Sequence, residues 1–479
     1  MARIPTATPT RRSFLLSSLA AIGASACSSA ASRGRIFGAN ERVRLGFVGL
    51  NGRGSELLSM FRSCKHASID ALCDVDSAVL DRAAVACGKH GETPRRFSDA
   101  VAMMESGAVD AVVIASPNHW HTLHGVLAME RGLDVYVEKP VSHDVWEGAQ
   151  LVASAARHRR VAACGTQCRS HRGVQDAIAF AQSGELGAIW LARGLCYKRR
   201  KSIGKASGPQ RPPASVDYDR WLGPAPAQDV RRLQFHYDWH WQRDFGNGDL
   251  GNQGVHQMDL CRMAVGLDAL PKRVVSIGGR LGYDDDGDTP NTQLVLCASD
   301  RAPILFEVRG LPSRSGSEEM DSFAGARIGL VLHCERGDVV ITSYYGGYAQ
   351  DQGNKRIAAF EGRGDHCANF VEAVRHADPS MLAADVLQGH LSAALCHLGD
   401  ASLRAGSAHS LAKCDEALSS EPMLAHEWEA MAKHLRDNGV RSDAEVRVGA
   451  SLLPVSDASR HPRRDYRAGY GLMDGGVTR

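Results

Sequence analysis

The sequence lacks several features that would assign it to a special class of protein. It has almost no net charge, with 56 Lys and Arg against 54 Asp and Glu, so no basic surface for nucleic acid is expected. Its 13 cysteines include no CxxC pair, which argues against structural zinc or a dithiol redox centre. It has no internal repeat of roughly 20 to 50 residues and no long low-complexity linker. A large globular enzyme or binding protein remains, with no nucleic acid as partner.

The first 40 residues predict an export signal instead of part of the fold. They contain five Arg, no acidic residue and one apolar run, from Phe14 to about Ala26, that is too short for a stable membrane span. The string TRRSFL at residues 10–15 resembles a twin-arginine signal, which directs folded proteins to export. Cys27 directly follows small residues, so a lipoprotein-type anchor at this cysteine is an alternative. We expect residues 1–40 to be signal and linker, and the protein to be periplasmic or otherwise exported.

The next segment predicts a nucleotide-binding domain over residues 41–163. The strand-like run Val43–Leu50 leads into GLNGRG at residues 49–54, and a helical stretch follows, as in a dinucleotide-binding turn. Gly49 suits the tight turn and Gly54 the close packing of helix on strand, whereas Asn51 replaces the middle glycine. Alone, such a broken motif is weak evidence for a nucleotide site.

The following strands strengthen this prediction. The strand Ser68–Cys73 ends at Asp74, 25 positions after Gly49, where a carboxylate can hydrogen-bond the ribose of NAD and repel the 2′-phosphate of NADP. An Asp that caps the next helix is the alternative for Asp74. Further apolar runs alternate with helical stretches, which predicts a doubly wound parallel sheet. These runs are Val109–Ala115, Asp134–Val137 and Val161–Ala163.

Polar clusters follow two of these strands, at the edge where an open α/β sheet binds its ligand. One cluster is SPNHWH at residues 116–121, and the other is Glu138-Lys139-Pro140. A lysine directly after a buried strand is unusual for a surface residue. If its ammonium faces a nicotinamide, its pKa could fall into the range useful for proton transfer. An ordinary solvated lysine is the alternative.

Together, the glycine turn, Asp74, the SPNxxH string and the Glu-Lys-Pro string resemble the Gfo/Idh/MocA family of nicotinamide-dependent sugar and cyclitol oxidoreductases. The resemblance spans roughly residues 43–406. It implies a Rossmann domain followed by an open-faced sheet domain, NAD as cofactor, Lys139 beside the nicotinamide and the substrate hydroxyl, and a homo-oligomer. The expected cofactor-binding residues are Gly49, Asn51, Gly52, Arg53, Gly54, Asp74, Ser116, Pro117, Asn118, His121, Glu138 and Lys139.

The pattern changes after residue 163. Longer strand-like runs without intervening helices predict an α+β domain with a large, mostly antiparallel sheet over residues 164–420. Beyond it, we expect only one helix, His426–Asn438, and an irregular tail over residues 421–479. An acidic run at residues 284–288 has no Glu at calcium-loop spacing and is expected to be a solvated turn.

A second group of chemical candidates lies in the segment 248–259. On a helix, Asn252, His256 and Asp259 would share one face, so a neighbour could orient the histidine. This resembles the family's Asp-x-x-x-His element, with Asn252 in place of the Asp. An amide cannot accept a proton at neutral pH, so proton transfer would fall on Lys139 and His256. We find too few further ligands around His256 and Asp259 for zinc, and no metal is expected.

Aromatic and polar residues earlier in this half suit a sugar ring, whose C–H faces stack on aromatic rings. The expected substrate-binding residues are Gln167, Arg169, Tyr197, Trp239, His240, Asn252 and His256. We therefore predict an NAD-dependent oxidoreductase that moves a hydride between a secondary alcohol of a sugar, glycoside or cyclitol and the nicotinamide, with Lys139, His256 and Asn252 as catalytic residues. One alternative is a glycosidase that recycles NAD through transient oxidation and elimination. Another is a non-catalytic sugar-binding protein with structural NAD.

Overall fold

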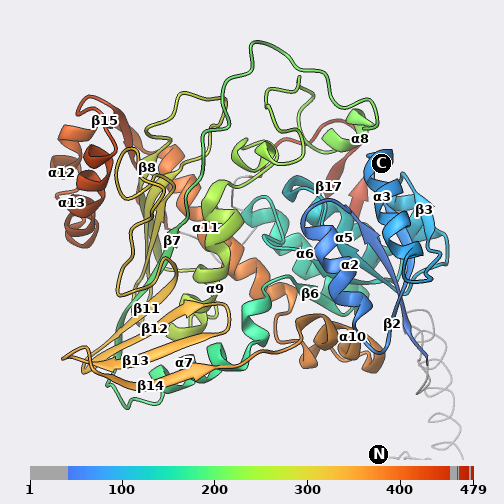
Figure 1. Ribbon diagram of the computed structural model, residues 1–479, viewed down its shortest axis with the longest axis horizontal. Coiled ribbons are helices and arrows are strands. Elements are labelled where there is room, and N and C mark those ends of the chain that lie inside the picture. The colour runs from blue at the N-terminus through green and yellow to red at the C-terminus, as the bar shows by residue number, and fades with distance from the viewer. Residues whose placement is uncertain (1–40, 454–460, 462, 474–475, 479) are drawn as a thin grey trace, which may run out of the picture.

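The computed structural model describes residues 41–453, 461, 463–473 and 476–478 (Figure 1). Residues 1–40, and with them the predicted twin-arginine signal and Cys27, lie outside the described residues. The amino-terminal half is a six-stranded parallel sheet in the order β3-β2-β1-β4-β5-β6. Its strands are β1 (Val43–Val48), β2 (Ala67–Cys73), β3 (Arg95–Phe97), β4 (Ala111–Ile114), β5 (Asp134–Val137) and β6 (Ala162–Cys164).

Helices cover both faces of this sheet, as its uninterrupted apolar strands require. In β4, Val112 and Ile114 join the core beneath one helical layer, whereas Ala111 and Val113 join the core on the opposite face. The predicted doubly wound fold is thereby confirmed. The helices are α2 (Arg53–Arg62), α3 (Ser77–Gly88), α4 (Ala100–Glu105), α5 (His121–Glu130) and α6 (Val145–His158).

The second half is built on a ten-stranded sheet in the order β14-β13-β12-β11-β7-β10-β9-β8-β16-β15. Its pairs are antiparallel except β7 with β10, so the predicted, mostly antiparallel sheet is confirmed. The strands are β7 (Ile189–Tyr197), β8 (Arg273–Gly279), β9 (Thr292–Ala298), β10 (Ile304–Arg309), β11 (Ile328–Cys334), β12 (Gly337–Ser343), β13 (Gly346–Asp351), β14 (Arg356–Glu361), β15 (Ser407–Ser410) and β16 (Glu445–Val448).

Helices pack on both faces of this larger sheet. The helices α7 (Arg172–Gln182), α9 (Val255–Val265) and α11 (Val386–Ala405) cover the face toward the first domain, and one apolar core runs through both domains there. On the other face, α13 (Pro422–Asp437) buries Trp428 and Met431 against β8 and β9, beside the short α12 (Cys414–Ala417) (Figure 1). Part of the expected open face is therefore covered.

The chain returns to the first domain twice. Helix α10 (His366–His376) packs Phe370 and Val374 into the core beneath β1 and α2. Near the C-terminal end, β17 (Gly471–Met473) and β18 (Gly476–Thr478) form a hairpin, and β18 lies against α5.

The C-terminal region differs from the expected irregular tail, because β16 pairs with β8 and β15. A four-residue strand with alternating charges carries too short a pattern to be recognised in sequence.

Candidate active site

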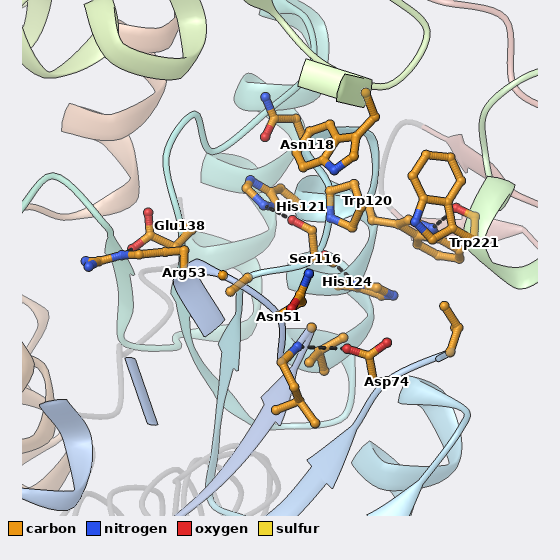
Figure 2. A pocket seen from close by; sticks show the side chains of 18 of the residues that line it. Asn51, Arg53, Asp74, Ser116, Asn118, Trp120, His121, His124, Glu138 and Trp221 are labelled. Carbon is orange, nitrogen blue, oxygen red and sulfur yellow. Dashed lines mark hydrogen bonds and ion pairs between the residues drawn. The ribbon is translucent and has the colours of Figure 1, made fainter. Parts of the chain in front are cut away.

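A large cavity of about 880 Å³ lies where the carboxyl ends of the parallel strands meet the second domain (Figure 2). One wall comes from the turns after β1, β2, β4 and β5, and the opposite wall comes from residues 198–256. Ligands bind at this edge in open α/β sheets. The cavity is therefore the candidate active site.

The glycine turn is shaped to receive a phosphate group. Gly49 has φ +82°, and a Cβ there would lie 2.6 Å from the carbonyl oxygen of Ala115. Gly52 has φ +49° and open space around it, and α2 begins at the next residue, so the N–H groups of its first turn point toward the cavity. Gly54 does not line the cavity but packs against the backbone of Gly49, the role expected for the third glycine.

Asp74 lines the cavity and is held in place from both sides. Its carboxylate accepts hydrogen bonds from the amides of Leu50, at 2.8 Å, and Asp76, at 2.9 Å. Burial raises the pKa of Asp74, against these hydrogen bonds, which lower it. The cap of α3 is Asp76, whose side chain accepts from Ala78. The capping alternative for Asp74 is thus wrong.

The clusters after β4 and β5 are joined by His121, which is buried. Its Nδ1 lies 2.7 Å from the carbonyl oxygen of Pro140 and its Nε2 lies 2.6 Å from that of Ser116. The nearby side-chain amide of Asn118, on η1 (Asn118–Trp120), donates to Asn247 of the second domain at 3.1 Å. His121 therefore fixes the spacing of two loops, and Asn118 ties one of them to the opposite wall.

Lys139 is half-buried, and its amine lies in the cavity. Its Nζ lies 2.6 Å from the main-chain oxygen of Asn252 and 3.2 Å from the side-chain Oδ1 of that residue. Burial lowers its pKa to about 8, although the charge of Glu138 acts in the opposite direction. Glu138 is engaged by Arg53 at 2.8 Å. The amine is therefore desolvated without a carboxylate of its own.

Asn252 and His256 lie on successive turns of one segment. Asn252 belongs to η4 (Leu250–Gly254), a π-helical turn, and His256 to the first turn of α9. His256 is buried, and its Nδ1 has no hydrogen-bond partner. Burial and the charge of Lys139 hold its pKa well below the usual value, so the ring is neutral. A neutral imidazole can donate one hydrogen bond and accept another.

The residue between them extends this group. The side-chain oxygen of Gln253 accepts from Lys198 Nζ at 3.0 Å, and its amide donates to the hydroxyl of Tyr344 at 2.7 Å. The ring of Tyr344 lies 5.4 Å from that of His256. Tyr344 lines the cavity but was not predicted, because it belongs to no recognisable motif. Lys198, which also lines it, follows the predicted Tyr197 in a polar and aromatic stretch of the sequence.

Two of the predicted substrate-binding residues lie outside the cavity. Arg169 is buried with its Nε 2.7 Å from Asp259, which also accepts from Ser392, so this pair joins parts of the second domain. Tyr197 is buried with its hydroxyl on Glu307. Neither lines the cavity. Asp259 is engaged by these partners and does not orient His256.

The remaining predicted substrate residues line the cavity. Trp239 and His240 stack on each other at 3.8 Å between ring centres, on η3 (Asp238–Trp241). Gln167 presents a buried side-chain oxygen that has no partner. These groups supply the flat aromatic surface and the free polar atoms expected for a sugar site.

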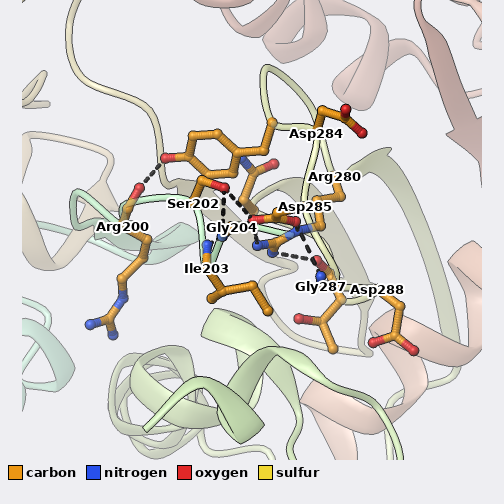
Figure 3. A network of polar contacts seen from close by, with 12 residues as sticks. Arg200, Ser202, Ile203, Gly204, Arg280, Asp284, Asp285, Gly287 and Asp288 are labelled. Atoms are coloured by element: carbon orange, nitrogen blue, oxygen red, sulfur yellow. Dashed lines mark hydrogen bonds and ion pairs between the residues drawn. The ribbon is translucent and has the colours of Figure 1, made fainter. Parts of the chain in front are cut away.

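A buried ion pair fixes the irregular segment that follows β7, behind this wall (Figure 3). Asp285 binds Arg280 through two contacts of 2.6 Å, and it accepts from Ser202 Oγ at 2.8 Å and from the amide of Ile203 at 2.9 Å. The predicted solvated turn is thus wrong at Asp285, whose side chain is 1% exposed, although Asp284 is exposed. The sequence pattern gave no sign of the distant partners.

In the part of the chain that the structure describes, no three His, Cys, Asp or Glu side chains are grouped to hold a metal ion. No helix among the same residues is long and apolar enough to cross a bilayer. The twelve cysteines in this part are buried and unpaired with one another.

Two family models match this chain. One, "Oxidoreductase family, NAD-binding Rossmann fold", matches residues 43–166, and the other, "Oxidoreductase family, C-terminal alpha/beta domain", matches residues 189–286. Both describe the Gfo/Idh/MocA oxidoreductases, in agreement with the resemblance seen in the motifs. The first domain is therefore an NAD-binding Rossmann domain, and the expected cofactor is confirmed. The glycine turn, the start of α2 and Asp74 fit its pyrophosphate and ribose.

Curated relatives are similar over part of the chain. "Glycosyl hydrolase family 109" proteins from Saccharopolyspora erythraea and Solibacter usitatus are 30% and 36% identical to it, each over 166 residues. The alignments cover 34% and 31% of this chain and 36% and 37% of the relatives. The chain thus matches little more than a third of the length of these relatives.

Solved structures share the fold over a longer stretch. One is the WlbA dehydrogenase from Bordetella pertussis in complex with NADH and UDP-GlcNAcA, with a TM-score of 0.56 at 16% identity. The alignment covers 75% of this chain and 97% of the dehydrogenase chain. Another is an aldose-aldose oxidoreductase from Caulobacter crescentus, with a TM-score of 0.56 at 15% identity. That alignment covers 75% of this chain and 98% of the oxidoreductase chain. At these identities the likeness shows the two-domain fold.

Proposed function

Since this chain combines the NAD-binding Rossmann domain and the C-terminal α/β domain of the Gfo/Idh/MocA oxidoreductases, we propose that it is an NAD-dependent oxidoreductase acting on a secondary alcohol of a sugar, glycoside or cyclitol. The observation that carries the proposal is Lys139, a half-buried lysine whose amine, with a pKa of about 8, lies at the junction of the two domains. An amine of this kind can exchange a proton with a substrate hydroxyl near neutral pH.

Three side chains of the cavity have separate roles in the proposed reaction. NAD, when bound, accepts or returns the hydride. The neutral amine of Lys139 takes the hydroxyl proton as the alcohol is oxidised, so no free alkoxide has to form. His256, which lines the cavity with a neutral ring, binds the same hydroxyl or passes the proton on. Asn252 holds the lysine amine through its two oxygens and takes no proton itself.

Replacement of the lysine tests this role. We expect Lys139→Ala to lower kcat by roughly 10²- to 10⁴-fold, the usual contribution of general acid–base catalysis, while NAD still binds. Stopped-flow hydride transfer and NAD titration measure the two quantities. Lys272→Ala is the control, because Lys272 is exposed and pairs with Asp300. Near-normal turnover by Lys139→Ala would show that the proton has another acceptor.

A second candidate is a glycosidase that recycles NAD, favoured by the names of the curated relatives. Oxidation of a sugar hydroxyl to a ketone acidifies the neighbouring C–H bond; loss of that proton expels the aglycone, and after water adds, the ketone is reduced again. Lys139 and His256 would then provide the two proton acceptors. Aglycone release without net NADH supports this candidate, whereas NADH formed in proportion to oxidised, uncleaved glycoside supports the first. Saturable sugar binding without either reaction would instead favour a sugar-binding protein.

We also propose that the protein is exported through the string at residues 10–15 and that it assembles as a homo-oligomer. Replacing Arg11 and Arg12 by Lys should retain the protein in the cytoplasm of a host with a twin-arginine pathway. Light scattering of the mature protein measures the number of subunits.

A further inference from the structure

The cavity continues beyond Asp74 into a second, aromatic end. There it is lined by the residues after β3, by one face of α5 and by two residues close to the C-terminal end of the sequence, Gly469 and Tyr470. With the ribose of NAD at Asp74 and the pyrophosphate at the start of α2, the adenine would lie at this end and the nicotinamide at the other end, beside Lys139. Residues 469 and 470 would then lie next to the part of NAD that takes no part in the chemistry.

The rings at this end form a packed group. The ring of Trp120 stacks on His124 with 4.3 Å between ring centres, and Tyr470 meets Trp120 edge-to-face at 5.6 Å. The indole N–H of Trp120 donates to the main-chain oxygen of Trp221, on α8 (Tyr218–Leu222), at 3.0 Å (Figure 2). Flat rings of this kind suit a nucleobase, which stacks on aromatic faces.

The segment 464–470 is anchored on the first domain by buried charges. Arg464 Nε lies 2.7 Å from Glu147, whose side chain is 1% exposed, and the hydroxyl of Tyr466 lies 2.6 Å from the same carboxylate. The main-chain amide of Arg464 also donates to Asp144 at 3.1 Å. These contacts fix the segment at the start of α6.

The same segment is also tied to the second domain. Arg467 donates from Nε to the main-chain oxygen of Gly223, at 2.9 Å, and from its NH2 group to that of Asp219, at 2.8 Å. Its own amide donates to the oxygen of Pro224 at 3.1 Å. The guanidinium thus satisfies carbonyl groups at the end of α8. Residues 464–470 thereby bridge the two walls of the cavity across its adenine end.

From these contacts we infer that residues 464–470 are part of the NAD site, with Tyr470 as an adenine-binding residue and Arg467 as the residue that positions the segment. The bridge closes the adenosine end and slows the release of the cofactor. This inference concerns cofactor binding alone and does not depend on which reaction the enzyme catalyses.

The test measures how fast NAD leaves the purified protein, by displacement with the fluorescent etheno-adenine analogue of NAD. Tyr470→Ala and Arg467→Ala should release NAD roughly tenfold faster or more, the size expected for one base-stacking contact. Tyr470→Phe keeps the ring and should resemble the wild type. Arg441→Ala is the matched control for the arginine, because Arg441 is exposed and pairs only locally with Asp443. Release from Tyr470→Ala within twofold of the wild-type rate would overturn the inference.

A second measurement uses the unaltered protein and so does not depend on variant folding. Trypsin can cleave after Arg464 and Arg467 only if the segment detaches. ADP-ribose, which carries the adenosine end, should slow this cleavage, whereas nicotinamide mononucleotide should not. Equal cleavage with and without ADP-ribose would show that the segment takes no part in holding the cofactor.

Discussion

At the scale of single residues, the reactivity of the site depends on Lys139, whose amine is desolvated without its own counter-ion. Glu138 lies next to Lys139 in the chain, but Arg53 engages its carboxylate. The amine is left with two oxygens of Asn252, which stabilise the ammonium less than a carboxylate would. Its pKa of about 8 follows from this arrangement, with burial as the main cause.

The pH dependence of the reaction should report this pKa. Alcohol oxidation requires the neutral amine, so kcat/KM should rise about tenfold per pH unit below pH 8 and level off above it. Ketone reduction requires the ammonium and should fall above pH 8. Initial rates in both directions between about pH 6 and pH 10 measure the two profiles. A profile for oxidation that stays flat across pH 8 would contradict the assignment.

The same pKa has a consequence for stability. Because it lies below the ordinary value of 10.5, the charged amine destabilises the fold below pH 8, and this cost disappears as the pH rises toward 10.5. Lys139→Met should therefore raise the free energy of unfolding more at pH 7 than at pH 10, as denaturant titration at the two pH values would measure. An equal change at both would mean that burial does not perturb this amine.

Residue types and motifs correctly predicted that Lys139 and His256 line the cavity. They also predicted Tyr197 as a substrate contact, but Tyr197 lies outside the cavity. Successive side chains of a strand point to opposite faces of the sheet, so Tyr197 at the end of β7 reaches Glu307 while the next residue, Lys198, faces the cavity. A single sequence does not fix which face a polar strand residue takes. Arg169 differs for another reason, since its partner Asp259 is 90 positions away.

At the scale of elements, the position of the segment after β7 depends on the carboxylate of Asp285. Burial by itself would raise the pKa of Asp285, but the hydrogen bonds and charge of Arg280 lower it overall. The stability it contributes is therefore present above the ordinary carboxyl range and is lost as the pH falls through the lowered value. The strands of the two sheets were predictable from apolar runs, whereas the order of the strands and this contact between two loops were not.

Removing the carboxylate of Asp285 should break the hydrogen bonds that hold the segment carrying Lys198 and Arg200. We expect Asp285→Ala to lower the free energy of unfolding by about 3–5 kcal/mol, because it leaves the largely buried guanidinium of Arg280 without a carboxylate, with only the main-chain oxygen of Thr289 to accept from it. Asp284→Ala should change it by less than about 1 kcal/mol, since Asp284 is exposed. Denaturant titration of the two neighbouring variants measures both. Equal effects would mean that the buried pair does not hold the segment.

At the scale of the whole molecule, one core joins the two domains. It contains Ile114 of β4 and Trp146 of α6 as well as Leu395 of α11 and Phe306 of β10. Such continuity could not be read from the sequence, in which the halves follow one another as separate patterns. The return of α10 and of residues 464–470 to the first domain was also hidden, because their partners are far away along the chain.

A shared core predicts a single unfolding transition. Leu395→Ala, which removes a fully buried side chain of α11, should lower stability by about 2–5 kcal/mol and shift the same transition that NAD binding raises. Differential scanning calorimetry with and without NAD measures this. Two separate transitions, with only one of them responding to NAD, would show that the domains unfold independently.

The walls of the adenine end come from three distant parts of the chain: Trp120, the end of α8, and residues 464–470. During synthesis the first two can assemble long before the third leaves the ribosome. The Rossmann domain can therefore meet NAD early, but on our inference the site closes only after residues 464–470 have emerged. Cofactor retention thus becomes a marker that residues 464–470 have been synthesised and have docked, and a chain truncated before residue 464 should reach the folded state with its cofactor still exchangeable.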